Sequence, residues 1–143
     1  MKPNMPPENT PAILPRTYVR ADDEGYTVEA EAVCIGNDVL IFIWGGERPH
    51  IGAVAAAQPR PSLADANARG ATASVLTYLG HKEDEVVKQV SETIAAALDR
   101  NVVVTAGIHW DNLDKKAIET IRVRVSKLTQ TLIDKLRKQG IGT

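Results

Sequence analysis

The sequence predicts an α+β domain of two layers, in which two helices pack on a mostly antiparallel sheet of five or six strands. Three observations predict this fold class. Five short segments are continuously apolar or alternate between apolar and polar residues, as strands do. Two longer segments repeat apolar residues at helical spacing instead. The chain order is four strands, a helix, a strand and a helix, and successive hairpins would make the sheet largely antiparallel.

The five expected strands differ in how they should be buried. Residues 25–35 alternate between small apolar and polar side chains, which predicts one exposed face. Residues 39–44 are apolar on both faces, which suits a central strand covered on both sides. Residues 50–58 are rich in alanine, so another element can approach closely. The remaining two strands are expected at 71–79 and 102–108.

Each expected helix carries one apolar stripe. The first helix is expected at 83–98, with acidic residues at its positive N-terminus. The second is expected at about 114–138, where apolar residues recur at near-heptad spacing. Asp111 or Asn112 could cap this second helix. Its length and narrow stripe would also suit a helical seam with a second subunit.

Length and proline content define the domain organisation. A chain of 143 residues is long enough to bury one core. Five of the eight prolines lie in residues 1–16, which predicts a flexible or extended N-terminal arm. Residues 17–143 are then expected to form a single domain.

Composition excludes several functional classes. The net charge of −1 provides no basic field for nucleic acid or anionic lipid. No apolar run approaches the ~20 residues that span a bilayer, and the N-terminus lacks a secretory signal pattern. The single cysteine, Cys34, cannot form an internal disulfide. We therefore expect a cytoplasmic protein.

All three histidines lie where a strand should end and the chain should turn. They are His50, His81 and His109, and each has a glycine or proline within two positions. Two of them lie close in sequence to the only tryptophans, Trp44 and Trp110. A ligand pocket at the edge of the sheet is the simplest explanation of this placement.

The first candidate segment joins two expected strands. Gly45 and Gly46, followed by His50, Ile51 and Gly52, form a loop whose backbone could approach a ligand closely. The alternative is a tight hairpin in which glycine only supplies a positive φ.

The second candidate segment opens the first helix. His81 and Lys82 follow Gly80, and free backbone N–H groups with a lysine could hold a phosphate. Against this, Glu83 and the two acidic residues after it could satisfy the helix dipole themselves.

The third candidate segment precedes the second helix. Capping explains Asp111 or Asn112 but leaves His109 and Trp110 unexplained. A capped helix start beside an indole is a shelf for a flat heterocycle. His109 could instead be a core histidine bonded to backbone.

Other chemistries have weaker signals. Three histidines suit a catalytic metal, and His50 and His109 are the candidate ligands, but intervals of 31 and 28 residues (50 to 81 and 81 to 109) do not preorganise a site. Cys34 lies in mid-strand with no activating histidine nearby in the sequence. No phosphate-binding loop, dinucleotide fingerprint or nucleophile-elbow motif is present, and no convincing carboxylate pair.

Together, three blocks of sequence resemble the prenylated-flavin chaperone family, the small D subunit found beside UbiD-type gallate and protocatechuate decarboxylases. The blocks are His50–Val54, Ser74–Thr77 leading into Gly80–Asp84, and Gly107–Asn112. The resemblance covers approximately residues 25–137.

The resemblance implies a fold similar to small proteasome-assembly chaperones, usually dimeric, and a role in holding prenylated FMN, or FMN, for a partner decarboxylase. The chain would then be a flavin-binding accessory subunit, more a cofactor chaperone than an enzyme. Lys82 would face the phosphate, and Trp44 or Trp110 the rings. His50 and His109 would face polar edges of the isoalloxazine or a bound metal. The implied lining residues are Trp44, Gly45, Gly46, His50, Ile51, Gly52, His81, Lys82, His109, Trp110, Asp111 and Asn112.

Two other functions stay open at the level of sequence. The chain could be a protein-interaction assembly chaperone without a cofactor, with structural histidines. It could also be a metal-dependent enzyme that uses those histidines. In addition, Trp110 stands where the family pattern has a smaller aliphatic residue.

Overall fold

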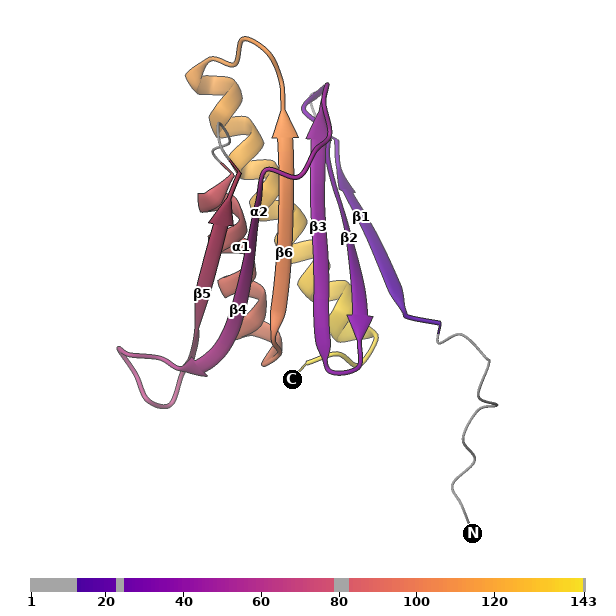
Figure 1. The fold of residues 1–143 in the computed structure, drawn as a ribbon. Coiled ribbons are helices and arrows are strands. Elements are labelled where there is room, and N and C mark those ends of the chain that lie inside the picture. The colour runs from indigo at the N-terminus through magenta and orange to yellow at the C-terminus, as the bar shows by residue number, and fades with distance from the viewer. Residues whose placement is uncertain (1–12, 23–24, 79–82, 143) are drawn as a thin grey trace.

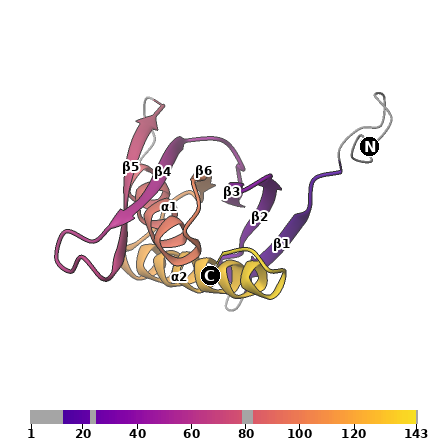
Figure 2. The same ribbon diagram turned by 90° about the horizontal axis from the view of Figure 1, so that it is seen from below.

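The computed structural model describes residues 13–22, 25–78 and 83–142. The described residues form one sheet with two helices on one of its faces (Figures 1 and 2). The elements in chain order are β1 (Arg16–Ala21), β2 (Val28–Ile35), β3 (Asp38–Gly46), β4 (Ala53–Pro61), β5 (Arg69–Thr77), α1 (Asp84–Leu98), β6 (Val102–His109) and α2 (Lys115–Lys138). The predicted α+β fold of two layers is confirmed.

The strand order is β1-β2-β3-β6-β4-β5. Of the five pairings, only β3 with β6 is parallel, so the sheet is mostly antiparallel as predicted. The prediction of successive hairpins is wrong at one place. β4 does not pair with β3, because β6 returns after α1 and inserts between them. Residues 47–52, the crossing segment, therefore pass across the end of β6 (Figure 1).

The structure adds a strand that the sequence analysis did not include. In β1, Thr17 and Val19 are buried, while Tyr18 and Arg20 are exposed. This alternation with period two is the sequence signal for the strand, and it lies directly after the proline-rich segment. Arg16, which was assigned to the arm, is the first residue of β1. Residues 1–12 lie outside the described part of the chain.

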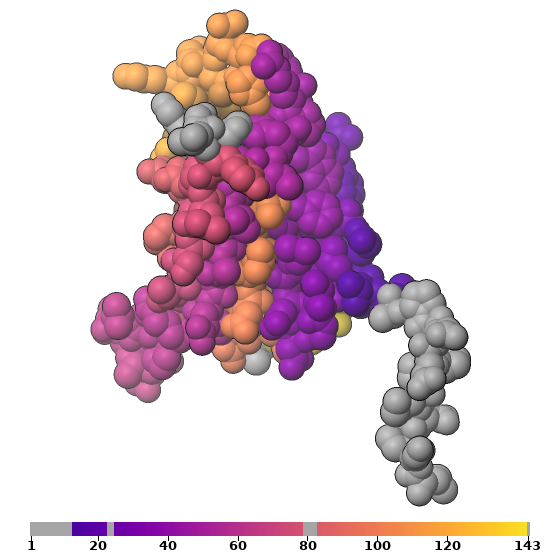
Figure 3. All heavy atoms as spheres, in the orientation of Figure 1, coloured from indigo at the N-terminus to yellow at the C-terminus, as the bar shows by residue number. Residues whose placement is uncertain are grey.

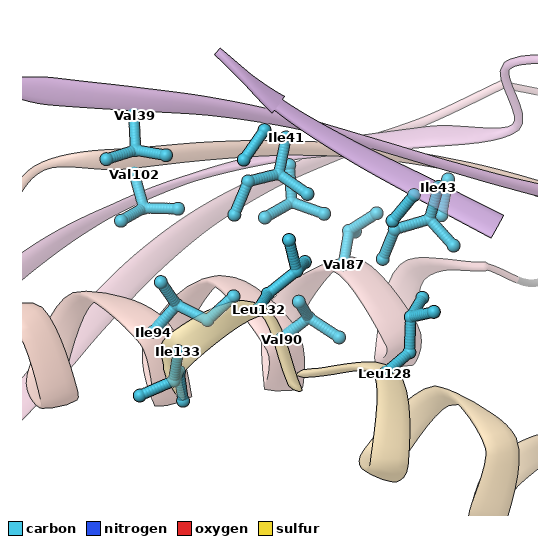
Figure 4. Packing of buried hydrophobic residues seen from close by; sticks show 14 of the residues in the cluster. Val39, Ile41, Ile43, Val87, Val90, Ile94, Val102, Leu128, Leu132 and Ile133 are labelled. Carbon is cyan, nitrogen blue, oxygen red and sulfur yellow. The ribbon is translucent and has the colours of Figure 1, made fainter. Parts of the chain in front are cut away.

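The core lies between the sheet and the helices and is aliphatic. Val39, Ile41 and Ile43 of β3 face the helices, and Figure 4 shows them against side chains of α1 and α2. Cys34 is also buried, and burial raises the pKa of its thiol. A neutral, protonated thiol fits the interpretation that Cys34 is not a nucleophile.

Helix α2 packs on β1, β2 and α1. Its residues Val125, Leu128, Leu132 and Leu136 are buried within the chain, so this stretch is not available for a helical seam. The predicted cap is also wrong. Asp114 caps α2, because its Oδ1 accepts a hydrogen bond of 2.7 Å from the backbone N–H of Ala117. Neither described helix is long and apolar enough to cross a membrane.

A matched pair of isoleucines tests this core. Ile41 is fully buried on β3, whereas Ile35 is 48% exposed. We expect Ile41→Ala to lower the free energy of unfolding by about 2–4 kcal/mol, because it leaves a cavity in the core. Ile35→Ala should cost less than about 1 kcal/mol. Urea denaturation followed by circular dichroism measures both, and equal losses would contradict the packing described here.

Candidate functional site

The candidate site lies at the end of the sheet where β3 and β6 stop. There the crossing segment lies directly against the backbone of Gly107. A Cβ atom on Gly107 would lie only 1.6 Å from the carbonyl oxygen of His50. Two backbone hydrogen bonds hold the segment in place, Glu47 N–H to His109 O at 2.8 Å and Gly52 N–H to Ala106 O at 2.9 Å. The crossing therefore requires glycine at position 107.

The glycine pair at the end of β3 has a structural role. Gly46 has φ +86°, and a Cβ atom there would lie 2.0 Å from the carbonyl oxygen of His109. A Cβ atom on Gly45 would lie 2.8 Å from the carbonyl oxygen of Thr27. Both glycines thus permit close backbone approach. They do so at the end of a strand, and not in the tight hairpin considered as an alternative.

His50 connects the crossing segment to the start of α1. Its Nδ1 lies 2.9 Å from the carbonyl oxygen of Arg48, so Nδ1 carries a hydrogen and donates. Its Nε2 lies 3.0 Å from Oε1 of Glu83. The imidazole is therefore fixed between its own segment and the residue that precedes α1.

Glu83 is a site residue that the sequence analysis treated only as an acid at a helix N-terminus. Its side chain is 11% exposed. The backbone N–H of Ile108 donates to its Oε1 at 3.4 Å, and a Cβ atom on Gly52 would lie 2.4 Å from its Oε2. Glu83 thus links α1, β6 and the crossing segment. No local pattern could have revealed this role, because its contacts come from distant parts of the chain.

His109 ends β6 and is paired with a different carboxylate. Its Nε2 lies 2.9 Å from Oδ1 of Asp111, and Nη2 of Arg48 lies 3.7 Å from Oδ2. The hydrogen bond from His109, followed by the charge of Arg48, lowers the pKa of Asp111. Asp111 therefore stays ionised and orients the exposed imidazole of His109.

Trp44 and Trp110 lie beside a common hollow of about 300 Å³, which we call the tryptophan hollow. Trp110 packs edge-on against Tyr26, with ring centroids 5.3 Å apart. Trp44 stacks with Phe42 at 5.9 Å. The full lining is Gly25, Thr27, Glu29, Trp44, Gly45, Gly46, Glu47, Pro49 and Trp110.

The structure brings together only part of the predicted site. Trp44, Gly45, Gly46 and Trp110 share the tryptophan hollow. His50 and His109 lie at the same end of the sheet but outside the lining of the hollow, each beside its own carboxylate. Of the remaining predicted site residues, Gly52 is buried, whereas Ile51, Asp111 and Asn112 are exposed. His81 and Lys82 lie outside the described residues.

The described residues contain no group of three histidine, cysteine, aspartate or glutamate side chains that could hold a metal ion. The candidate ligands His50 and His109 each have one carboxylate nearby, Glu83 and Asp111. A larger groove of about 350 Å³ lies between α1 and α2, and none of the predicted site residues lines it.

Residues 22–137 match the family model for the prenylated flavin chaperone LpdD-like domain. The chain belongs to this family. The resemblance inferred from the three sequence blocks is therefore confirmed. Protein LpdD of Lactiplantibacillus plantarum is 27% identical over 122 residues, which cover 84% of this chain and 85% of that protein.

A solved structure supports the fold. A chain in the crystal structure of a chaperone complex for yeast 20S proteasome assembly superposes with a TM-score of 0.51 and 12% sequence identity. The match covers 86% of this chain and 96% of the other. The predicted similarity to proteasome-assembly chaperones is confirmed at the level of fold.

Substitution of Gly107 by alanine, which adds one methyl group, tests how tightly the crossing segment packs on β6. We expect Gly107→Ala to lower the free energy of unfolding by about 2 kcal/mol or more, because backbone must move to admit the new Cβ atom. Gly70→Ala is the control, since its Cβ atom would meet the flexible end of Arg60 at 3.1 Å. Urea denaturation of both variants gives the comparison. A loss at Gly107 no larger than at Gly70 would show that the crossing is loose.

The pairing of His109 with Asp111 predicts a pH effect. Because the folded-state pKa of Asp111 lies below its ordinary value of 3.8, the pair stabilises the site above that value and is lost as the pH falls through the lowered one. We expect His109→Ala to raise the pKa of Asp111, measured by NMR titration, more than Arg48→Ala does. The reverse order would mean that Arg48 is the main partner.

Proposed function

We propose that the chain binds prenylated FMN, or FMN itself, at this end of the sheet and holds it for a UbiD-type decarboxylase. The observation that carries the proposal is the tryptophan hollow, where Trp44 and Trp110 lie beside the backbone of Gly45 and Gly46. The family of this chain is described as prenylated flavin chaperones. The proposal also places the protein in the cytoplasm as a homodimer.

The lining of the hollow suits a flat, partly polar heterocycle. Two indoles, one of them braced by Tyr26, offer apolar surface to rings. Gly45 and Gly46 also line the hollow, and their lack of a Cβ atom lets the backbone of Thr27 and His109 pack closely beside it. The volume of about 300 Å³ is at the lower end for ligand pockets, so part of a flavin would extend beyond it. A shallow site of this kind suits a carrier that must release its ligand.

The polar residues around the hollow are suited to holding the crossing segment in position. Glu83 fixes His50, and His50 fixes the crossing segment that borders the hollow at Glu47 and Pro49. A carrier needs a shaped and shielded site more than it needs an acid–base pair. Following the family resemblance, Lys82 would bind the phosphate of the cofactor.

Direct binding tests the proposal. The protein, purified anaerobically from cells that make prenylated FMN, should show a flavin absorbance spectrum and the matching mass. Equilibrium dialysis should show saturable binding, and Trp44→Leu or Trp110→Leu should weaken it by about tenfold, because stacked aromatic contacts are worth about 1–1.5 kcal/mol. Tyr78→Leu, an aromatic residue 66% exposed and outside the hollow, is the control. A folded protein with no saturable binding of either flavin would refute the proposal.

Two further arms of the same experiment address the phosphate and the delivery. Lys82→Ala should weaken FMN binding but leave riboflavin binding unchanged, because riboflavin lacks the phosphate. Lys88→Ala, at an exposed helix position paired with Glu92, should affect neither ligand. Delivery predicts that the loaded protein activates a cofactor-free UbiD-type decarboxylase faster than free cofactor does at the same concentration.

A further inference from the structure

The groove of about 350 Å³ between α1 and α2, which we call the helix groove, has an aliphatic floor. The floor residues recur at helical spacing on each helix and are Val86, Val90, Ile118, Ile121 and Val125. Val90 and Val125 are buried, whereas Ile118 is 47% exposed. The helix groove therefore leaves apolar surface open to water, which is typical of a binding surface.

The helix groove and the exposed face of the sheet lie on opposite sides of the chain. Figure 3 shows the sheet side, with β6 at the surface between β3 and β4. The sequence predicts that β3 is covered on both sides, yet the helices cover only one. Figure 2 shows α1 and α2 together on that other side. A partner in the helix groove would thus leave the sheet face uncovered.

The helix groove lies toward the end of the molecule that holds the candidate site. Both helices begin at that end and run in the same direction (Figure 1). Their far ends are joined, because Nη2 of Arg137 donates a hydrogen bond of 3.0 Å to the carbonyl oxygen of Ala97. At the near end, α1 begins directly after Glu83, whose carboxylate contacts His50 and Ile108. A partner in the helix groove would therefore contact the helix that starts at the site.

The rim of the helix groove carries two opposite charges, Glu85 from α1 and Arg122 from α2. Both residues are exposed, and in the part of the chain that the structure describes neither side chain forms an ion pair or a hydrogen bond. Elsewhere on α1, by contrast, Lys88 pairs with Glu92 at 2.8 Å. The groove thus has one acidic and one basic edge, and it is complementary to a partner with the opposite arrangement.

The length of the helix groove suits a third helix. Its lining extends over residues 85–93 of α1 and 118–130 of α2, which corresponds to about 12 Å and about 18 Å of helix. A helix of three turns is about 16 Å long and presents side chains three, four and seven positions apart on one face. Amphipathic helices bind apolar grooves through such side chains.

We infer that the protein that receives the cofactor docks an amphipathic helix in the helix groove, with a basic side chain toward Glu85 and an acidic one toward Arg122. This inference rests on the proposed function, in which the receiving protein is a UbiD-type decarboxylase. The apolar face of the docked helix covers the aliphatic floor. The two charges fix its direction, because a helix turned end for end would bring like charges together.

Two aliphatic residues of α2 form a matched pair that tests the floor of the helix groove. Ile118 and Val123 are 47% and 50% exposed, but only Ile118 lines the groove. We expect Ile118→Glu to weaken binding of the loaded protein to a purified, cofactor-free UbiD-type decarboxylase of the same organism by about tenfold or more. Val123→Glu should leave this affinity unchanged. Isothermal titration calorimetry measures the affinity, and circular dichroism confirms that each variant is folded.

A second pair of variants tests the rim. Arg122→Glu should also weaken binding to the decarboxylase by about tenfold or more, because it opposes an acidic side chain of the docked helix. Lys116→Glu, at an exposed residue of α2 outside the groove, is the control and should have a much smaller effect. Equilibrium dialysis should show unchanged flavin affinity in all four variants, because none of the substituted residues lines the tryptophan hollow.

The outcomes separate the docking site from the proposed function. Weaker decarboxylase binding in the two groove variants alone, with flavin affinity unchanged, supports the inference. Equal effects of Ile118→Glu and Val123→Glu overturn it, as does a wild-type protein that binds flavin but not the decarboxylase. A change in the mass of the free protein on Ile118→Glu, measured by light scattering, would mean that a second copy occupies the groove and would also overturn it. Decarboxylase binding through the groove without any flavin binding refutes the proposed function and leaves the docking site standing.

Discussion

The site depends on one steric constraint, the passage of residues 47–52 over β6. Hydrogen bonds on either side bring the carbonyl of His50 so close to Gly107 that no side chain fits between them. Because the passage is this tight, the crossing segment has little freedom once β6 is in place. The imidazole of His50 is then held near Glu83, and the hollow acquires a wall at Glu47 and Pro49. A tight backbone contact thus determines where the side chains of the candidate site lie.

The sequence was most informative where the signal was local. The alternation in β2, the continuous apolar run in β3 and the two helical stripes gave the element types and the fold class, with ends correct to within a few residues. The neighbours of each strand in the sheet could not be predicted in this way, because periodicity specifies which face of a strand is buried and not which strand lies beside it. Nothing near β4 in sequence indicates that β6 separates it from β3. The helix cap failed for a related reason. Asp111, Asn112 and Asp114 all satisfy the capping rule, and the turn that includes Asn112, at φ +58°, shifts the start of α2 to the third of them.

The candidate site shows the same limit. Clustering of glycines, histidines and tryptophans at strand ends predicted a site at one edge of the sheet, and the structure places Trp44, Gly45, Gly46 and Trp110 around one hollow there. It did not show that the two described histidines belong to separate pairs, His50 with Glu83 and His109 with Asp111. Both histidines lie close to their carboxylates in space, but only His109 and Asp111 are also close in sequence. Glu83 therefore went unrecognised, although it contacts both His50 of the crossing segment and the backbone of Ile108 in β6.

The doubly apolar β3 connects the fold with the proposed function. A strand with Ile41 and Ile43 on one face and Phe42 and Trp44 on the other has more apolar surface than two helices can cover. Leaving such a surface in water costs roughly 25 cal/mol for each Å². In the proposed function, the rings of a bound flavin cover the part of this surface near Trp44, where β3 reaches the tryptophan hollow. The apolar residues that make β3 a central strand would then also supply binding energy for a flat cofactor.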